Sequence, residues 1–120
     1  MISEILEKWC DENNISISDT QKQKFETYAK LLSEWNKKIN LTAITEDTEV
    51  AIKHFIDSIT LLKYADIKDN ASVIDIGTGA GFPGIPLKIM RDDINLTLLD
   101  SLNKRLVFLD EVCNTIDIKA

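Results

Sequence analysis

Two carboxylates and three glycines are spaced along this chain in a pattern that suits ligand binding. Asp75 is followed at every second position by Gly77, Gly79 and Gly81, and Asp100 stands 21 residues after Gly79. Glycine lets the backbone turn tightly and lets a ligand approach the main chain without an intervening Cβ atom. Ionised carboxylates accept hydrogen bonds from amines and hydroxyl groups. The spacing therefore predicts a small-ligand site built from bare backbone and two acids.

The segments around these residues predict the strands and helices that must position them. A β-branched run over 72–76, "SVIDI", leads directly into the glycines, and "INLTLLD" over 94–100 predicts a second strand. Apolar spacing predicts a short helix near 85–90 and a longer one over 101–116. Strands that alternate with helices form parallel sheets, whose ligands bind beyond the carboxyl ends of the strands. Both acids should therefore lie at one edge of the sheet.

Three helices are predicted ahead of the first strand. Apolar residues at helical spacing indicate one helix over 2–12 and another over 48–64. Between them, Ser18 and Gln21 have the types and spacing of a capping box, which predicts a helix that runs to about residue 37. The segment "NLTAITEDTE" is expected to connect the second helix to the third.

The order of these elements predicts an α/β fold with two parts. A helical leader over 1–68 is expected to pack on the sheet, and 69–120 is expected to form the first βαβα part of a Rossmann-like sheet. A parallel sheet of two strands is small and needs cover on both faces. We therefore expect the truncated N-terminal part of a larger α/β protein, or a chain that completes its sheet by association. The oligomeric state stays open.

Composition and charge exclude several classes of protein. The chain has 120 residues, a net charge of -6, 44% hydrophobic residues and 28% charged residues, which is ordinary for one globular domain. No apolar stretch approaches the ~20 residues of a membrane span, and the N-terminus does not have the pattern of a secretory signal. Cys10 and Cys113 lie far apart and outside any CxxC pair, so we expect reduced thiols of a cytoplasmic protein and no metal site. The acidic balance disfavours strong non-specific binding to nucleic acid, but it allows a local basic surface.

Three nucleotide-binding templates compete for the glycine turn. A phosphate-binding P-loop needs Lys and then Ser or Thr where this chain has Ile85 and Pro86. The dinucleotide fingerprint needs its third glycine where the chain has Phe82, and prolines at the start of the next helix remove amides that a pyrophosphate would use. The third pattern, an acid followed by three alternate glycines, resembles the first motif of Rossmann-like methyltransferases that use S-adenosylmethionine. An NAD-binding Rossmann domain and a non-catalytic nucleotide-fold binding module stay open as alternatives.

Four longer stretches narrow the resemblance to one family. In chain order they are "WNKKINLTAI" over 35–44, "HFIDSITLL" over 54–62, "DIGTGAGFPGIPL" over 75–87 and "LLDSLNKRLVFL" over 98–109. Together they resemble the RsmG (GidB) family of bacterial small-subunit ribosomal RNA methyltransferases. The Phe-Pro-Gly-Ile-Pro continuation of the glycine turn is far more selective than the glycines alone.

The resemblance implies an activity, a cofactor and a partner. The activity is transfer of a methyl group from S-adenosylmethionine to N7 of a guanine in 16S rRNA, either free or in a precursor of the small ribosomal subunit. Family cofactor contacts fall on Gly77 and Phe82, while Asp75 suits the amine of the cofactor and Asp100 suits its ribose hydroxyls. The expected cofactor-binding residues are Asp75, Gly77, Gly79, Gly81, Phe82 and Asp100. Family members continue well beyond this length, so we expect the segment alone to be inactive.

No catalytic residue is assigned. Guanine N7 has a free lone pair, so its attack needs no general base, and the rate would come from alignment and from exclusion of water. His54, Asp57 and Ser58 lie about one turn apart on a predicted helix, and we expect them to make local polar contacts rather than a hydrolytic triad. Lys104 and Arg105 are the favoured candidates for phosphate contact, because they follow Asp100 closely.

Overall fold

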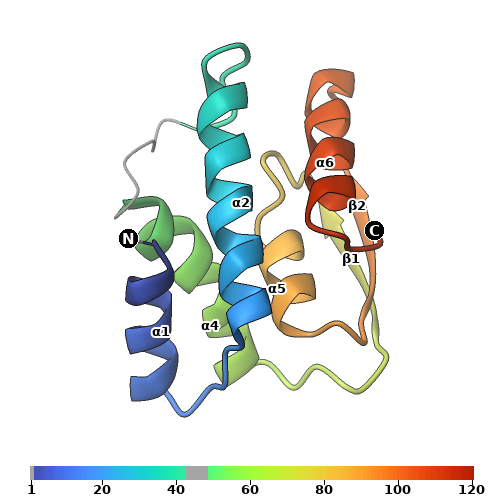
Figure 1. The fold of residues 1–120 in the computed structure, drawn as a ribbon. Coiled ribbons are helices and arrows are strands. Elements are labelled where there is room, and N and C mark those ends of the chain that lie inside the picture. The colour runs from blue at the N-terminus through green and yellow to red at the C-terminus, as the bar shows by residue number, and fades with distance from the viewer. Residues whose placement is uncertain (1, 43–48) are drawn as a thin grey trace.

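The structure of this chain is a computed structural model that describes residues 2–42 and 49–120. Helices fill the first half, and two strands alternate with two helices in the second half. The bounds are α1 Ile2–Glu12, α2 Asp19–Asn36, the π-helical η1 Val50–Ile56, α4 Asp57–Tyr64, β1 Ser72–Ile76, α5 Gly84–Met90, β2 Asn95–Leu99 and α6 Asn103–Thr115. Figure 1 shows the first helices on one side, the strand pair on the other, and α5 between them. This arrangement confirms the predicted α/β fold class.

The start of α2 is fixed by the capping box that the sequence predicted. Ser18 Oγ accepts a hydrogen bond from the backbone N–H of Gln21 at 3.1 Å, and Gln21 Oε1 accepts one from the backbone N–H of Ser18 at 2.8 Å. The Gln21 side chain also donates to the carbonyl of Ile89 at 3.2 Å, which ties the start of α2 to α5. Neither α2 nor any other helix of the described residues is long and apolar enough to cross a membrane.

The helix expected over 48–64 is present from residue 49, and most of its first half, η1, is a π-helix that continues into α4. At the junction, the His54 carbonyl accepts from the backbone N–H of Asp57 and from Ser58 Oγ, the latter at 2.6 Å. A side chain that bonds to a helical carbonyl competes with the regular ladder, and π-turns form where the ladder is interrupted. Residue 48 and most of the expected connector lie outside the described residues.

The sheet brings the two predicted strands together in parallel. The register runs from Ser72 opposite Asn95 to Ile76 opposite Leu99, so the two strands end level with each other. The chain returns between them through α5, which contacts both strands as well as α2 and α4. Because parallel strands share one carboxyl edge, the residues after β1 and after β2 meet there.

One apolar core joins the helical segment to the sheet. At its centre, the Phe55 ring lies 4.9 Å from the Phe25 ring and 5.3 Å from the Tyr28 ring, measured between centroids. All three side chains are buried, and the cluster extends from α1 to the residues after α6. The predicted boundary between 1–68 and 69–120 falls in the loop between α4 and β1, but this core spans it. The division into two domains stays a prediction.

The outer face of the sheet is apolar and exposed. Ile74 is 60% exposed, Ile76 is 80% exposed and Leu99 is 47% exposed, and all three point away from α5. Parallel sheets are normally covered on both faces, because their strands are apolar on both sides. The outer face of this strand pair is therefore a surface that needs cover.

We expect this face to bind a dye that reports exposed apolar surface. The chain should enhance the fluorescence of anilinonaphthalene sulfonate, and the double change Ile74→Lys and Ile76→Lys should remove most of the enhancement. Val107→Lys is the matched control, because Val107 is 47% exposed but lies on α6. Equal losses in the control and in the double variant would contradict the prediction.

Candidate functional site

The glycine turn predicted after the first strand connects β1 to α5. The φ angles of Gly77, Gly79 and Gly81 are 68°, 59° and 101°, a region of backbone conformation that side chains with a Cβ atom rarely adopt. The backbone N–H groups of Gly77 and Thr78 both donate to the carbonyl of Leu99, at 2.8 and 3.0 Å. The turn is therefore anchored to the end of β2 as soon as it leaves β1.

Asp75 lies beneath this turn and holds it. Its Oδ2 atom accepts a hydrogen bond from Thr78 Oγ1 at 2.7 Å and another from the backbone N–H of Gly84 at 2.9 Å. Thr78 is itself buried, and nothing in its sequence position marked it as a partner of the acid. The structure thus gives Asp75 a positioning role within the loop, while its predicted contact with a ligand amine stays a prediction.

Asp100 follows β2 at the carboxyl edge of the sheet, and its carboxylate bonds to the glycine turn. Its Oδ2 accepts from the backbone N–H of Gly79 at 2.9 Å, and its Oδ1 accepts from the backbone N–H of Leu102 at 2.9 Å. Arg105 Nη1 lies 3.4 Å from both oxygens, and the Asp100 side chain is only 2% exposed. The Leu102 amide, followed by the Gly79 amide and Arg105, lowers the pKa of this carboxyl group. Asp100 is therefore an ionised carboxylate whose two oxygens are both engaged.

The far side of the turn rests on the helical segment through Tyr28. The Tyr28 hydroxyl donates to the carbonyl of Ala80, and burial raises the pKa of this phenol well above its ordinary value. A Cβ atom added at Gly81 would lie 2.6 Å from that hydroxyl oxygen and 2.7 Å from Ile85 Cδ1. Tyr28 lies on the buried face of α2. Its contact with the turn spans 52 positions, and no local signal could have revealed it.

His54 stacks on Phe82, one of the predicted cofactor contacts. The two rings are nearly parallel, with an interplanar angle of 6° and centroids 4.3 Å apart. His54 Nε2 lies 2.8 Å from Thr42 Oγ1, and Ser58 Oγ bonds to the His54 carbonyl, so the predicted local polar contact within the helix is present. The structure therefore places His54 against the glycine turn, a position that its spacing on the predicted helix did not indicate.

The single histidine of the chain offers a test of this contact. Burial lowers the pKa of His54 from its ordinary value of 6.5. The unfolded chain therefore takes up this proton first, and stability should fall as the pH falls below about 6.5. We expect the ring protons to titrate below that value in an NMR pH series and to return to about 6.5 in urea. A folded-state pKa at or above 6.5 would contradict the stacked, partly buried placement.

Most backbone amides of the turn are used inside the protein. Those that donate to protein acceptors are the amides of Gly77, Thr78, Gly79, Gly81, Phe82 and Gly84. A pyrophosphate bound at a helix start would need such amides, and here α5 begins behind Pro83. The arrangement suits a ligand without phosphate, and it gives no support to the NAD-binding alternative.

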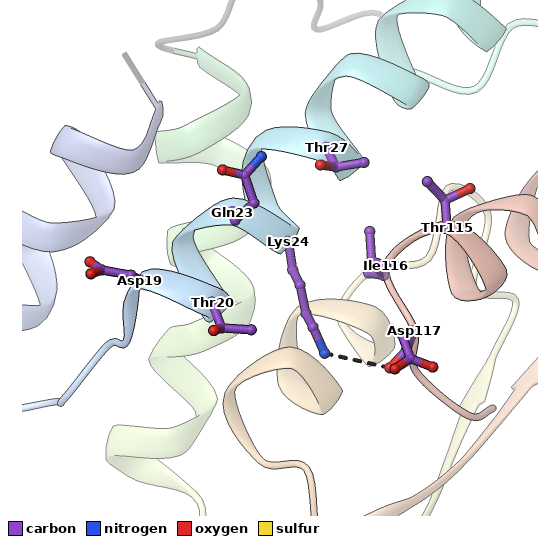
Figure 2. Close-up of a pocket in the computed structure, with 8 residues that line it drawn as sticks. All are labelled: Asp19, Thr20, Gln23, Lys24, Thr27, Thr115, Ile116 and Asp117. Carbon is purple, nitrogen blue, oxygen red and sulfur yellow. Dashed lines mark hydrogen bonds between the residues drawn. The ribbon is translucent and has the colours of Figure 1, made fainter.

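Two hollows lie at opposite ends of the seam between α2 and α6. One is near the glycine turn, where the residues after α2 meet the start of α6 and Arg105 lines its wall. The other, of about 430 Å³, lies between the start of α2 and the end of α6 (Figure 2). In Figure 2, Lys24 reaches across it and donates to the carbonyl of Asp117 at 3.5 Å. This second hollow is remote from the carboxyl edge of the sheet.

A glycine turn at the carboxyl edge of a parallel sheet, with an acid at the end of the next strand, is the arrangement of a Rossmann-like α/β protein. Residues 21–120 match the family GidB, described as rRNA small subunit methyltransferase G. The chain belongs to this family, which confirms the resemblance found in the sequence.

Curated relatives agree with the family match. The chain is 53% identical to a protein of Clostridium perfringens (strain 13 / Type A) over 97% of this chain and 48% of the relative. It is 60% identical to a protein of Desulforamulus reducens over 89% of this chain and 45% of the relative, and 54% identical to one of Clostridium beijerinckii over 94% and 47%. Each relative is named "Ribosomal RNA small subunit methyltransferase G". The chain spans about half the length of these relatives.

Proposed function

We propose that this chain supplies the first half of a cytoplasmic methyltransferase that moves a methyl group from S-adenosylmethionine to guanine N7 in 16S rRNA. The observation that carries the proposal is the junction of Asp100 with the backbone of Gly79 at the carboxyl edge of the sheet. It couples the acid after the second strand to the glycine turn after the first. The names of the relatives support the choice of ribosomal RNA as the substrate.

The turn has room for a ligand against its backbone. A Cβ atom added at Gly77 or at Gly79 would meet no other atom within 4 Å, and Gly77 is exposed. Phe82 is half-buried, and its ring stacks on His54 and on Tyr28, with centroids 4.3 and 5.6 Å away. These residues fit the methionine and adenosine parts of the proposed cofactor, which pack on backbone and on apolar surface.

Asp100 can accept hydrogen bonds from the ribose hydroxyls if they displace Arg105 from its carboxylate. Its carboxylate already accepts two short hydrogen bonds from backbone amides, at 2.9 Å each, whereas the Arg105 contacts are 3.4 Å long. Hydrogen bonds between ionised groups are usually shorter than this, so the Arg105 contacts are the weaker ones. We expect ribose hydroxyls to replace Arg105 and to leave the two amides in place.

The proposed reaction requires little acid–base catalysis by the protein. The bound cofactor would supply a methyl group activated by its sulfonium. The carbon–sulfur bond would break, with its electron pair staying on sulfur as a thioether, as the lone pair of guanine N7 forms the new bond to carbon. The residues of this chain would contribute by holding the cofactor in one orientation and by keeping water away. No proton needs a base before the attack, so His54 is assigned no catalytic part.

Two measurements on the longest reading frame that contains this chain test the proposal. Isothermal titration calorimetry should show binding of S-adenosylmethionine, and tritium from the methyl-labelled cofactor should appear in 16S rRNA. The 120-residue chain is expected to bind the cofactor weakly and to transfer no methyl group. Absence of both signals in the longer protein would refute the methyltransferase proposal and would favour a non-catalytic binding module.

A further inference from the structure

The hollow next to Arg105 is basic, although the chain as a whole carries a net charge of -6. It measures about 300 Å³ and lies between the residues that follow α2 and the start of α6. Lys38 comes to it from the α2 side, and Lys104 and Arg105 come to it from α6. Three cations from two segments that are distant in sequence therefore converge on one groove.

The two lysines are available to a ligand. Lys38 and Lys104 are exposed, and neither takes part in an ion pair within the described residues. Lys38 Nζ lies 5.4 Å from the centre of the Trp35 ring, a cation–π contact that does not neutralise the charge of the ammonium. Arg105 is tied to Asp100 and so places the groove beside the candidate cofactor site.

Among the described residues, the rest of the groove lining is apolar or uncharged. Ile39, Leu41 and Leu102 contribute apolar surface, Asn40 adds an amide, and Leu102 is 50% exposed. An RNA strand offers matching chemistry, because its phosphates attract the cations and its sugar and base faces pack on apolar surface. A basic groove on a chain with a net charge of -6 also favours this place for a polyanion over the acidic parts of the surface.

We infer that this groove, with Lys38 and Lys104 at its rim, binds the phosphate backbone of the substrate RNA next to the cofactor site. The inference rests on the proposed function, because it takes RNA as the substrate. The two lysines are positioning residues, which hold the strand where the start of α6 meets the end of β2. Neither lysine touches the reacting atoms.

The test compares two double variants of the longest reading frame that contains this chain. One removes the groove lysines, Lys38→Ala with Lys104→Ala. The control removes Lys8 and Lys68, which are exposed, on α1 and on the loop before β1. Affinity for a short fluorescein-labelled single-stranded RNA is measured by anisotropy over a series of salt concentrations.

The groove variant should bind RNA roughly tenfold more weakly at low salt, and the slope of log affinity against log salt should fall by about 0.7 for each lysine removed. The control should keep both the affinity and the slope of the unchanged protein. Equal behaviour of the two variants, or an unchanged slope in the groove variant, would overturn the inference. The inference would also be overturned if the groove variant lost affinity for an acidic peptide as strongly as it lost affinity for RNA.

Calorimetry with S-adenosylmethionine separates this inference from the proposed function. The hydrogen bonds of Asp100 come from Gly79, Leu102 and Arg105 and from neither lysine, so the groove variant should bind the cofactor as the unchanged protein does. Loss of RNA binding with intact cofactor binding supports the groove. If the unchanged protein binds no cofactor, the proposed function fails, while the salt slopes still decide whether the groove binds RNA.

Discussion

Gly81→Ala is expected to disrupt the glycine turn and to lower the free energy of unfolding by about 2–5 kcal/mol. The φ angle of Gly81 is 101°, which costs a residue with a Cβ atom about 1–2 kcal/mol. The new methyl group would also lie 2.6 Å from the Tyr28 hydroxyl oxygen and 3.1 Å from Leu109 Cδ2. Overpacking of this kind costs about 1–3 kcal/mol in a buried site.

Gly79→Ala is the matched control for this change. Gly79 also has a positive φ, of 59°, but a Cβ atom there would meet nothing within 4 Å. Its cost should therefore be the backbone strain alone, about 1–2 kcal/mol. Urea unfolding followed by circular dichroism measures both variants. Equal stabilities of the Gly81 and Gly79 variants would show that the contact between the turn and α2 is not as close as the structure has it.

Asp100→Asn is expected to weaken the junction of the two strands and to lower cofactor affinity at least tenfold. The carboxylate accepts from the amides of Gly79 and Leu102 on its two oxygens, whereas Asn has only one oxygen. One of these amides would then face an NH₂ group. Loss of a buried hydrogen bond costs about 1–3 kcal/mol, and about 1.4 kcal/mol corresponds to tenfold in affinity.

The pH dependence of the free energy of unfolding gives a second test of the Asp100→Asn variant. The amides of Leu102 and Gly79 lower the pKa of Asp100 from its ordinary value of 3.8. The unfolded chain is therefore protonated first as the pH falls, and the stabilisation from Asp100 is present above about pH 4 and is lost below it. The stability of the unchanged protein should fall more steeply below about pH 4 than that of the Asn variant. Asp110→Asn, on the exposed side of α6, is the control for loss of a negative charge.

The sequence by itself determined the parts of this protein that depend on local patterns. The capping box at Ser18, the alternation of strands with helices and the spacing of Gly77, Gly79 and Gly81 are local. They require only the preferences of neighbouring residues. The place of Asp100 beside the turn was also predictable, since parallel strands must end at a shared edge.

Tertiary structure decided which side chains hold the turn. Tyr28 reaches Ala80 and His54 stacks on Phe82 because the helical segment packs on α5 and on the turn that precedes it. The packing of α6 beside α2 gathers the basic groove. Such contacts form between residues far apart in the chain. They depend on how whole elements pack together, and the pattern of neighbouring residues does not encode that packing.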